Sequence, residues 1–326
     1  MTYSLEYIWT GGSGEFRSKV RIMNELPEYS PVWNYDGSST GQATTESSQC
    51  TLIPVRTYTD RKNPTYIYVL CDTPERQKMT AIKETLDMWI GFEQEFFIWD
   101  LITDKALGVY ENMPGQGAYY CGVEPVAGYD YSRKHTVADL LRLTELIASR
   151  CCDIGCELTG YNLEVAPGQT EIQVMSRSAL KACDDLMMMR FMAHRILIVE
   201  RCKPVWDPKP LGPEWNGTGL HTNVSTGATR CEGGIQAIYE YMDLLSQKHA
   251  EHLAVYGSGN AARLTGLHET SSMKQFTWSV GGRHTSVRIP SEVPLAGCGY
   301  FEDRRPAGNA NPYLIAERIL RTLTRS

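Results

Sequence analysis

The strongest constraint on how this chain can fold is a pair of glutamates inside an otherwise apolar segment. Glu93 and Glu95 lie two residues apart, between the runs WIGF at 89–92 and FFIW at 96–99. The aromatic and β-branched residues predict a strand at 92–99, and side-chain alternation places both carboxylates on one face. The apolar flanks indicate an interior strand, where two carboxylates require cations. An exposed edge strand with solvated glutamates is the alternative, and it better explains an isolated Glu-x-Glu pair.

A second acidic pair favours the interior interpretation. The dipeptide Pro167-Gly168 is a turn signal, and a hairpin centred on it places Glu164 opposite Glu171. Like charges that face each other across a ladder repel unless a cation lies between them. Oxygen ligands of this kind suit Mg²⁺ or Mn²⁺ rather than zinc.

Two further segments contain candidate ligands that also have ordinary structural explanations. His221, Asn223 and Ser225 alternate along 221–225, so they share one face of a predicted strand. A single histidine in such a place is more often a hydrogen-bonding core residue than a ligand. Near the C-terminus, Glu302 and Arg304 share a face, and a surface ion-pair cluster is the alternative there.

Several arginines lie among glycines and short apolar runs in the last quarter of the chain. Such settings suit guanidinium groups that hold phosphate or carboxylate by paired hydrogen bonds. Together with metal ligands they indicate a phosphoryl group in transfer, although arginines and glutamates could also simply neutralise one another. The chain has no Walker-type Gly-x-x-x-x-Gly-Lys-Ser/Thr loop, so any ATP is held in another way. The arginines are Arg263, Arg283, Arg288, Arg304 and Arg305.

The order of expected elements indicates an α+β protein with two domains. A small N-terminal sheet domain at 1–75 is predicted from strands at 4–10, 16–23 and 66–71. The remainder, 76–326, has helical periodicity at 79–90, 137–151, 180–202 and 235–255. Its further strands are expected at 161–174, 220–225, 276–280 and 285–290. Because strands and helices do not alternate regularly, we expect an antiparallel catalytic sheet flanked by helices.

Composition argues against several classes of protein. The net charge is −6 and the pI is near 5.7, which disfavours nucleic acid or an anionic membrane as the main partner. No apolar run approaches the ~20 residues of a membrane span, and no basic segment followed by an apolar one opens the chain, so we expect a cytoplasmic protein. None of the ten cysteines forms a Cys-x-x-Cys pair, so reduced, buried thiols are expected, including Cys151, Cys152 and Cys156.

Six segments together resemble the signature segments of the glutamine synthetase family in its shorter eukaryotic (type II) form. They occur in order over nearly the whole chain, and jointly they are specific, although each alone is weaker. The family's small domain is β-grasp-like, which the resemblance implies for residues 1–75. The segments are WNYDGSST at 33–40, GFEQE at 91–95, NLEVAPGQ at 162–169, NGTGLHTN at 216–223, RLTGLHET at 263–270 and GYFEDRRP at 299–306.

The resemblance implies a site for ATP, glutamate, ammonium and two or three Mg²⁺ or Mn²⁺ ions. The ion that contacts glutamate would be held by Glu95, Glu164 and Glu171, and the ion on the ATP phosphates by Glu93, His221 and Glu302. Glutamate-binding positions would be Asn216, Gly217, Arg263 and Arg304, with Ser39 as a further substrate contact. The transferring phosphate would meet Arg283 and Arg288, and the nucleotide would meet Asn223, Ser225 and Tyr300.

The implied reaction is the ATP-dependent ligation of ammonia to the γ-carboxylate of glutamate through a γ-glutamyl phosphate. Asp36 would bind ammonium and take its proton, and Glu269 in a glycine-flanked segment would close over the site and exclude water. In the family, the residue at Asp36 completes the site of a neighbouring subunit. The resemblance therefore implies a ring-shaped homo-oligomer, expected as two stacked pentamers.

Some positions depart from the family pattern and leave alternatives open. Thr170 replaces a usual Trp and Ala262 a usual Arg, changes that we expect in the pocket walls; 124–133 aligns poorly and 289–296 is atypical. One alternative is a related ligase that attaches a larger amine, which the acidic pair Asp36 and Glu269 disfavours. A catalytically silent structural relative is another. A guanidino kinase is a third, although it has no use for the Asp36 segment.

Overall fold

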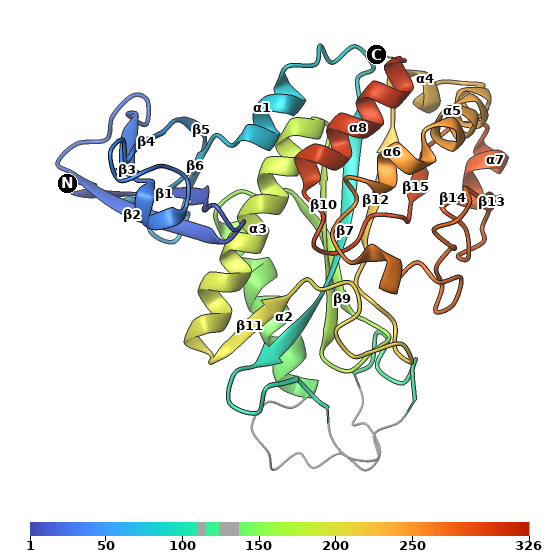
Figure 1. The fold of residues 1–326 in the computed structure, drawn as a ribbon, viewed down its shortest axis with the longest axis horizontal. Helices are drawn as coiled ribbons and strands as arrows, with labels where there is room; N and C mark the ends of the chain where they lie inside the picture. The colour runs from blue at the N-terminus through green and yellow to red at the C-terminus, as the bar shows by residue number, and fades with distance from the viewer. Residues whose placement is uncertain (110–114, 124–136, 326) are drawn as a thin grey trace.

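The computed structural model describes residues 1–109, 115–123 and 137–325. Within them lie a four-stranded sheet, a two-stranded sheet and a nine-stranded sheet, with helices gathered around the largest (Figure 1). The poorly matching segment 124–133 falls outside the described residues.

The N-terminal sheet has the order β2-β1-β6-β5, in which β1 and β6 are parallel. One face buries Leu5, Tyr7 and Trp9 in a small core of its own, while Ile8 and Tyr68 belong to the large apolar core of the rest of the chain. The three expected strands are present, and β3, β4 and β5 are additional. The bounds are β1 Tyr3–Thr10, β2 Phe16–Met23, β3 Trp33–Asp36, β4 Gln49–Leu52, β5 Pro54–Thr59 and β6 Tyr66–Cys71, with a 3-10 turn at Ser38–Thr40.

The prediction of a helix at 79–90 is wrong. Helix α1 spans Pro74–Thr80, begins at the N-cap Thr73, whose side chain accepts from the Arg76 amide, and ends where the expected helix should start. The Glu84 carboxylate then accepts from the amides of Leu86 and Met88, which holds a turn. From residue 89 on, pairing with a neighbouring strand overrides the helical spacing of the apolar residues.

The large sheet has the order β13-β14-β15-β12-β7-β10-β9, with β8 and β11 also paired to the long central strand β7. Every ladder in it is antiparallel except the one between β13 and β14, so the antiparallel expectation holds with that exception. The bounds are β7 Trp89–Asp100, β8 Lys105–Ala106, β9 Leu158–Leu163, β10 Gln169–Ser176, β11 Cys202–Val205, β12 Leu220–Ser225, β13 Trp278–Val280, β14 Val287–Ile289 and β15 Phe301–Asp303.

Helices α2 (Val137–Asp153) and α3 (Ala179–Val199) pack against one face of this sheet. Phe92, Phe96 and Ile98 of β7 point to that face and are fully buried in the main core. The Met-rich run at 187–192 is likewise core, as expected. Helix α3 starts after its N-cap Ser178 and stops before 202, because Cys202 already begins β11.

The remaining helices lie on the right and upper parts of Figure 1. The helix expected at 235–255 is broken at Lys248 into two pieces, and the C-terminal helix α8 was not expected. The bounds are α4 Gly227–Arg230, α5 Ile235–Gln247, α6 His249–Leu253, α7 Glu292–Ala296 within the atypical 289–296 segment, α8 Pro312–Thr324 and a 3-10 turn at Asn260–Ala262.

A buried carboxylate ties the small sheet to the rest of the chain. Asp184 of α3 accepts from Arg56 Nε of β5 at 2.7 Å, from Arg76 Nε of α1 at 2.9 Å and from Tyr313 OH of α8 at 2.7 Å. The carboxylate is fully buried, so its charge is balanced by these donors rather than by water. Since apolar packing is also continuous between the parts, the boundary at 75/76 stays a prediction.

All ten cysteines are free thiols. Cys151 and Cys156 are buried as expected. The expectation of burial was wrong for Cys121, Cys152 and Cys231, which are exposed, and Cys50 and Cys298 are only partly buried. None of the helices in the described part of the chain combines the length and the hydropathy that a transmembrane span requires.

Candidate metal and substrate site

The carboxylates predicted from the sequence gather on the sheet face that α2 and α3 leave uncovered. Alternation along β7 sends Glu93 and Glu95 to that face, while Gln94 points into the core. In the ladders, Glu95 pairs with Glu171 of β10, and Glu93 pairs with His221 of β12. Strand register therefore brings together residues that are far apart in sequence.

The prediction that Glu164 and Glu171 lie directly opposite each other across the hairpin is wrong. Glu171 pairs with Asn162, not with Glu164, because β9 already ends at Leu163. Glu164 lies in the turn, where its amide donates to the Gln169 carbonyl at 2.9 Å. Its side chain still reaches the same place, since one ligand atom from each of Glu95, Glu164 and Glu171 lies within 4.8 Å of the others.

This three-glutamate group has the properties of a site for a hard cation. Burial, and then the charge of Glu95, raises the pKa of Glu164 to about 8. Burial, followed by the charges of Glu93 and Glu95, raises the pKa of Glu171 to about 9. Among the described residues, no lysine or arginine forms an ion pair with any of the three. Their oxygen atoms fit Mg²⁺ or Mn²⁺, which would relieve the repulsion.

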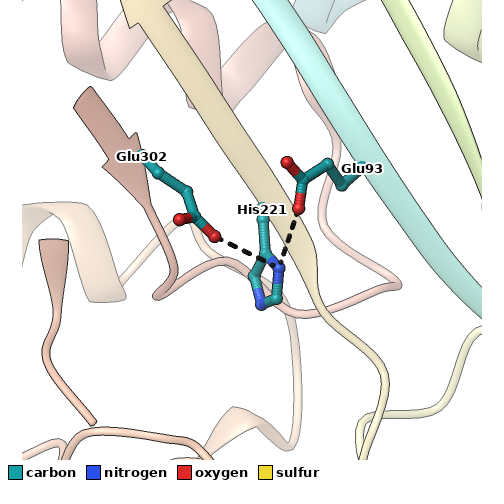
Figure 2. A group of neighbouring side chains, drawn as sticks. All are labelled: Glu93, His221 and Glu302. Atoms are coloured by element: carbon teal, nitrogen blue, oxygen red, sulfur yellow. Dashed lines mark hydrogen bonds and ion pairs between the residues drawn. The ribbon is translucent and has the colours of Figure 1, made fainter. Parts of the chain in front are cut away.

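A second group consists of Glu93, His221 and Glu302, which come from β7, β12 and β15 (Figure 2). His221 Nδ1 lies 3.3 Å from Glu93 Oε2 and 3.6 Å from Glu302 Oε1. Burial, and then the charge of Arg304, lowers the pKa of His221 to about 3, so the imidazole is neutral and able to act as a ligand. The two carboxylates also suit Mg²⁺ or Mn²⁺, whereas the imidazole nitrogen taken alone would suit a transition metal.

The second group differs from the first because arginines already balance its charge. Glu302 Oε1 accepts from Arg304 Nη1 at 2.5 Å, and Oε2 accepts from Arg288 Nη1 at 3.0 Å. The Nε of Arg304 is buried and has no partner among the described residues. A substrate carboxylate or phosphate would supply the acceptor that this donor lacks.

Two cavities meet at Glu93, which lines both. The first has a volume of about 130 Å³ and a polar wall that includes Glu95, Glu164, Glu171, His221, Asn216, Gly217, Arg263, Glu269, Arg283 and Arg304. The second has a volume of about 420 Å³ and a more apolar wall that includes Trp89, Ile90, Phe92, Val174, Met175, Asn223, Ser225 and Tyr300. The expected glutamate and nucleotide residues thus divide between the two, and Arg288 lies beside Glu302 outside both linings.

Two glutamines that the sequence analysis gave no role support these walls. Gln169 Nε2 donates to the Gly217 carbonyl at 3.0 Å and to Glu95 Oε2 at 3.4 Å. Gln116 Oε1 accepts from the Asn216 amide at 2.5 Å, and its Nε2 lies 2.8 Å from His268 Nδ1. Gln169 lies within a signature segment, but no pattern in the sequence singled out Gln116.

The segment with Glu269 has an unusual backbone. His268 and Glu269 have φ values of 53° and 60°, in the left-handed region that non-glycine residues avoid. Glu269 Oε2 lies 3.9 Å from Arg283 Nη1 at the rim of the polar cavity, and both side chains are about half exposed. This backbone conformation costs free energy, which is consistent with a segment that moves.

Asp36 and Ser39 lie apart from the other predicted residues. Neither cavity is lined by any residue before Trp89, and β3, which ends at Asp36, lies across the molecule from β12 and β15 (Figure 1). The Asp36 carboxylate accepts from the Ser38 hydroxyl at 2.6 Å and the Ser39 hydroxyl at 2.7 Å. These hydrogen bonds lower the pKa of Asp36 to about 2. Ser39 therefore supports Asp36 here, and its role as a substrate contact stays a prediction.

The two departures from the family pattern do not line the cavities, so the expectation that they alter the pocket walls was wrong. Thr170 points to the helix-covered face, where its hydroxyl donates to the Asn162 carbonyl at 3.0 Å and accepts from Thr144 Oγ1 at 2.9 Å. Ala262 is exposed in the turn before Arg263.

Comparison with known proteins gives the family. A model described as glutamine synthetase, catalytic domain, matches residues 74–255, more than half of the chain. The chain belongs to the glutamine synthetase family. A glutamine synthetase of Neurospora crassa is 42% identical over 339 residues, covering 97% of this chain and 90% of that protein. One of Emericella nidulans is 41% identical over 341 residues, covering 98% and 91%.

A solved structure agrees with the family assignment at the level of the fold. A cryo-EM structure of Plasmodium falciparum glutamine synthetase is similar with a TM-score of 0.74 and 19% identity, covering 99% of this chain and 72% of that chain. Membership of the glutamine synthetase family removes the guanidino kinase alternative. It leaves the choice of amine open.

Proposed function

We propose that this chain is a glutamate–ammonia ligase, which uses ATP to convert glutamate and ammonia into glutamine, ADP and phosphate. The observation that carries the proposal is the pair of three-ligand groups on one sheet face, at the junction of a polar and a more apolar cavity. Family membership supports the same reaction. Two charged groups and two differently lined cavities suit a reaction in which one substrate transfers a phosphoryl group to another.

Glutamate and ATP would occupy the two cavities. Arg263, Arg304 and the backbone at Asn216 would hold glutamate in the polar one, with its γ-carboxylate toward Glu93. The base of ATP would pack on the apolar wall of the other, where Asn223, Ser225 and Tyr300 provide polar contacts. Because Glu93 lies at the junction, the two substrates would meet there.

The reaction has two steps. An oxygen of the γ-carboxylate attacks the γ-phosphorus of ATP and ADP leaves, which makes an acyl phosphate. Ammonia then attacks the γ-carbon, the bond to phosphate breaks, and the nitrogen loses one proton to the departing phosphate. Arg283 and Arg288 would stabilise the charge of the transferring phosphoryl group. Metal ions bound at the two groups would neutralise phosphate and carboxylate charge. Glu269 would close over the acyl phosphate and exclude water.

We propose two or three Mg²⁺ or Mn²⁺ ions per chain, held by Glu95, Glu164 and Glu171 and by Glu93, His221 and Glu302. Charge supports two unequal sites, since arginines neutralise Glu302 but not the three-glutamate group. Titration of chelator-treated protein with Mn²⁺ measures the number of ions and their affinities. The Glu171→Gln variant should lose the tightest binding event, whereas Glu157→Gln, an exposed control, should bind as the wild type does.

We propose that Asp36 binds ammonium in the site of a neighbouring subunit, within a ring of two stacked pentamers. Two features support this: Asp36 is exposed, and neither cavity is lined by a residue before Trp89. With its pKa near 2, Asp36 is charged at neutral pH, which suits the holding of a cation better than the taking of a proton.

A subunit-mixing experiment tests this arrangement. Homogeneous Asp36→Ala and Glu171→Gln oligomers should both be inactive, but oligomers that contain both variants should regain part of the activity, because some interfaces then combine an intact Asp36 with an intact Glu171. Absence of any recovery in verified mixed oligomers would contradict the shared site. Light scattering of the wild type measures the ring size.

The decisive assay follows ADP release with glutamate, ATP and Mg²⁺, with and without ammonium. Release that depends on ammonium and yields glutamine supports the proposal. Turnover only with a larger amine would assign the chain to the related γ-glutamyl-amine ligases. No turnover with any amine, with Mg²⁺ or Mn²⁺, would leave the catalytically silent relative as the explanation.

We propose a cytoplasmic location. The ten free thiols support it, because reducing compartments keep cysteines unpaired. Fractionation of source cells with an antibody against the chain tests it.

A further inference from the structure

A basic cleft lies away from the two cavities, between α5, α6 and the C-terminal end of α8. Its volume is about 620 Å³, within the range of sites for small molecules. Among the residues that the structure describes, four cations line it, and the only carboxylate in the lining is Glu251; the cations are Lys248, Arg318, Arg321 and Arg325.

The cations of this basic cleft exceed the carboxylates that neutralise them. Glu251 is shared, since it accepts from Lys248 Nζ at 2.8 Å and from Arg318 Nη1 at 2.7 Å. Arg321 Nε pairs at 2.5 Å with Glu317, which does not line the cleft. With Glu317 counted as well, the positive charges of the described residues exceed the negative ones by two. The partial negative charge of the C-terminus of α8 offsets only part of this excess.

Two of the arginines have unused hydrogen-bonding capacity. Arg318 Nε is buried and has no hydrogen-bond partner within the described residues. Arg325, whose side chain is exposed, forms no ion pair with any described carboxylate. On an ordinary solvated helix surface, water would accept hydrogen bonds from such donors. The buried Nε of Arg318 is out of contact with water and has no acceptor in the described part of the chain. Phosphate and carboxylate oxygens are the acceptors that guanidinium groups match best.

A buried chain of hydrogen bonds runs from the basic cleft to the metal site. Thr322 of the lining lies 2.8 Å from His252 Nε2, and His252 Nδ1 lies 2.6 Å from Tyr256 OH. Tyr256 OH donates to Asp303 Oδ2 at 2.8 Å. All four side chains are buried, and Asp303 directly follows the candidate ligand Glu302 on β15.

We propose that the basic cleft binds a small anion with two or more phosphate or carboxylate groups. Binding of the anion would also restrain the backbone of β15, through the hydrogen-bonded chain of Thr322, His252, Tyr256 and Asp303. Two or more anionic groups are required because the cations come from two sides of the cleft, α8 and the junction of α5 and α6. The anion would fix the end of α8 against α6, and Thr322 and His252 would transmit that restraint.

Calorimetric titration with inorganic pyrophosphate and, separately, with citrate tests the binding. Metal-free protein at constant ionic strength is used for the wild type, for Lys248→Gln/Arg325→Gln and for the control Arg61→Gln/Lys105→Gln, which removes the same charge from exposed positions elsewhere. The cleft variant should bind at least about tenfold more weakly, and the control should bind as the wild type does. Equal affinity in all three proteins, or equal weakening in both variants, would overturn the proposal.

The two anions separate the possible ligand sources. Tighter binding of pyrophosphate indicates a phosphorylated metabolite, and tighter binding of citrate indicates a di- or tricarboxylate. A second binding event that the cleft variant retains belongs to the arginines of the metal site. The titration measures the heat of anion binding and requires neither metal ions nor turnover. A negative result for the cleft is therefore distinguishable from failure of the proposed ligase activity.

Amide hydrogen exchange tests the connection to β15. In the wild type, the saturating anion should slow exchange both at the end of α8 and at 301–303. Thr322→Val keeps the four cations and the shape of the side chain but removes the hydrogen bond to His252, so the anion should slow exchange only in α8. If β15 does not respond in the wild type, or responds equally in the variant, the transmission part is wrong.

Discussion

Glu171 lies directly opposite Glu95 in the antiparallel ladder between β10 and β7, and both carboxylates are buried. Glu164 approaches the same point from the hairpin turn. Packing therefore forces like charges together, and the metal-free fold must keep protons on some of them. Stability and protonation are coupled at this place in the sheet, and a metal ion bound there would be coupled to both.

Removing one of these charges should stabilise the metal-free protein. At pH 7 the free energy of unfolding of the Glu171→Gln variant should be higher by about 1–3 kcal/mol. The pKa of Glu171 is raised to about 9, so the wild type must take up a proton there on folding, and glutamine avoids that cost. Urea denaturation in the presence of a chelator measures the difference. The exposed change Glu157→Gln should have no effect; an equal gain there, or a loss in Glu171→Gln, would contradict the prediction.

The stability of the metal-free protein should fall as pH rises. The pKa values of Glu164 and Glu171, about 8 and about 9, exceed their ordinary 4.5, so the folded state binds more protons than the unfolded state between these limits. Each group contributes its full stabilisation below about pH 4.5. Between that pH and its pKa in the folded state, the contribution falls by at most about 1.4 kcal/mol per pH unit. Urea denaturation from pH 5.5 to 8.5 should show this decline, with a shallower slope in Glu171→Gln. A stability advantage of Glu171→Gln over the wild type that stays flat or shrinks as pH rises would contradict it.

Asp184→Asn should loosen the attachment of the small sheet. The change removes a fully buried charge from Arg56 and Arg76 and leaves a guanidinium without its main partner, at a cost of about 3–5 kcal/mol. Denaturation measures the loss, and hydrogen exchange should show the increase first in β5 and α1. Asp72→Asn is the matched control, because Asp72 pairs with Arg76 only at 3.6 Å. Similar losses in both variants would argue against a special role for Asp184.

Thr170→Val should affect stability and leave substrate selection unchanged. The hydroxyl of Thr170 contacts Thr144 and Asn162 on the helix-covered face, so its loss should cost about 1 kcal/mol. Because the side chain does not line either cavity, KM for ammonium and the preference among amines should be those of the wild type. A shift in amine preference would mean that this face communicates with the pocket.

Substitutions at Glu269 should separate backbone strain from the function of the carboxylate. Glycine suits the φ of 60° at this position, whereas alanine does not, so Glu269→Gly should be more stable than Glu269→Ala by about 1 kcal/mol. Both variants should lose activity, because both lack the carboxylate that we propose closes over the site. Thermal unfolding and the rate of glutamine formation measure the two effects. Equal stability of the variants would show that the strain is relieved elsewhere.

Local signals were sufficient for much of the fold. The strand expected at 220–225 is β12 with the same bounds, because a short alternating segment has one favourable arrangement against a core. Asn311 followed by Pro312 is a helix-start signal that would have revealed α8. The error at 79–90 has the opposite origin, since helical spacing of apolar residues was overridden at Trp89 and Ile90 by strand pairing with β12.

The sequence by itself determined the ligand types and the faces to which they point, because side-chain alternation along a strand is a local property of the backbone. Only the tertiary structure decided which ligands meet. Glu171 faces Glu95 rather than Glu164 because a ladder's register depends on where each strand ends and what packs beneath it. Alternation also explains why Thr170, which is next to Glu171 on β10, faces away from the cavities. The place of Asp36 outside them was decided by the tertiary structure, since it depends on contacts between segments far apart in the chain.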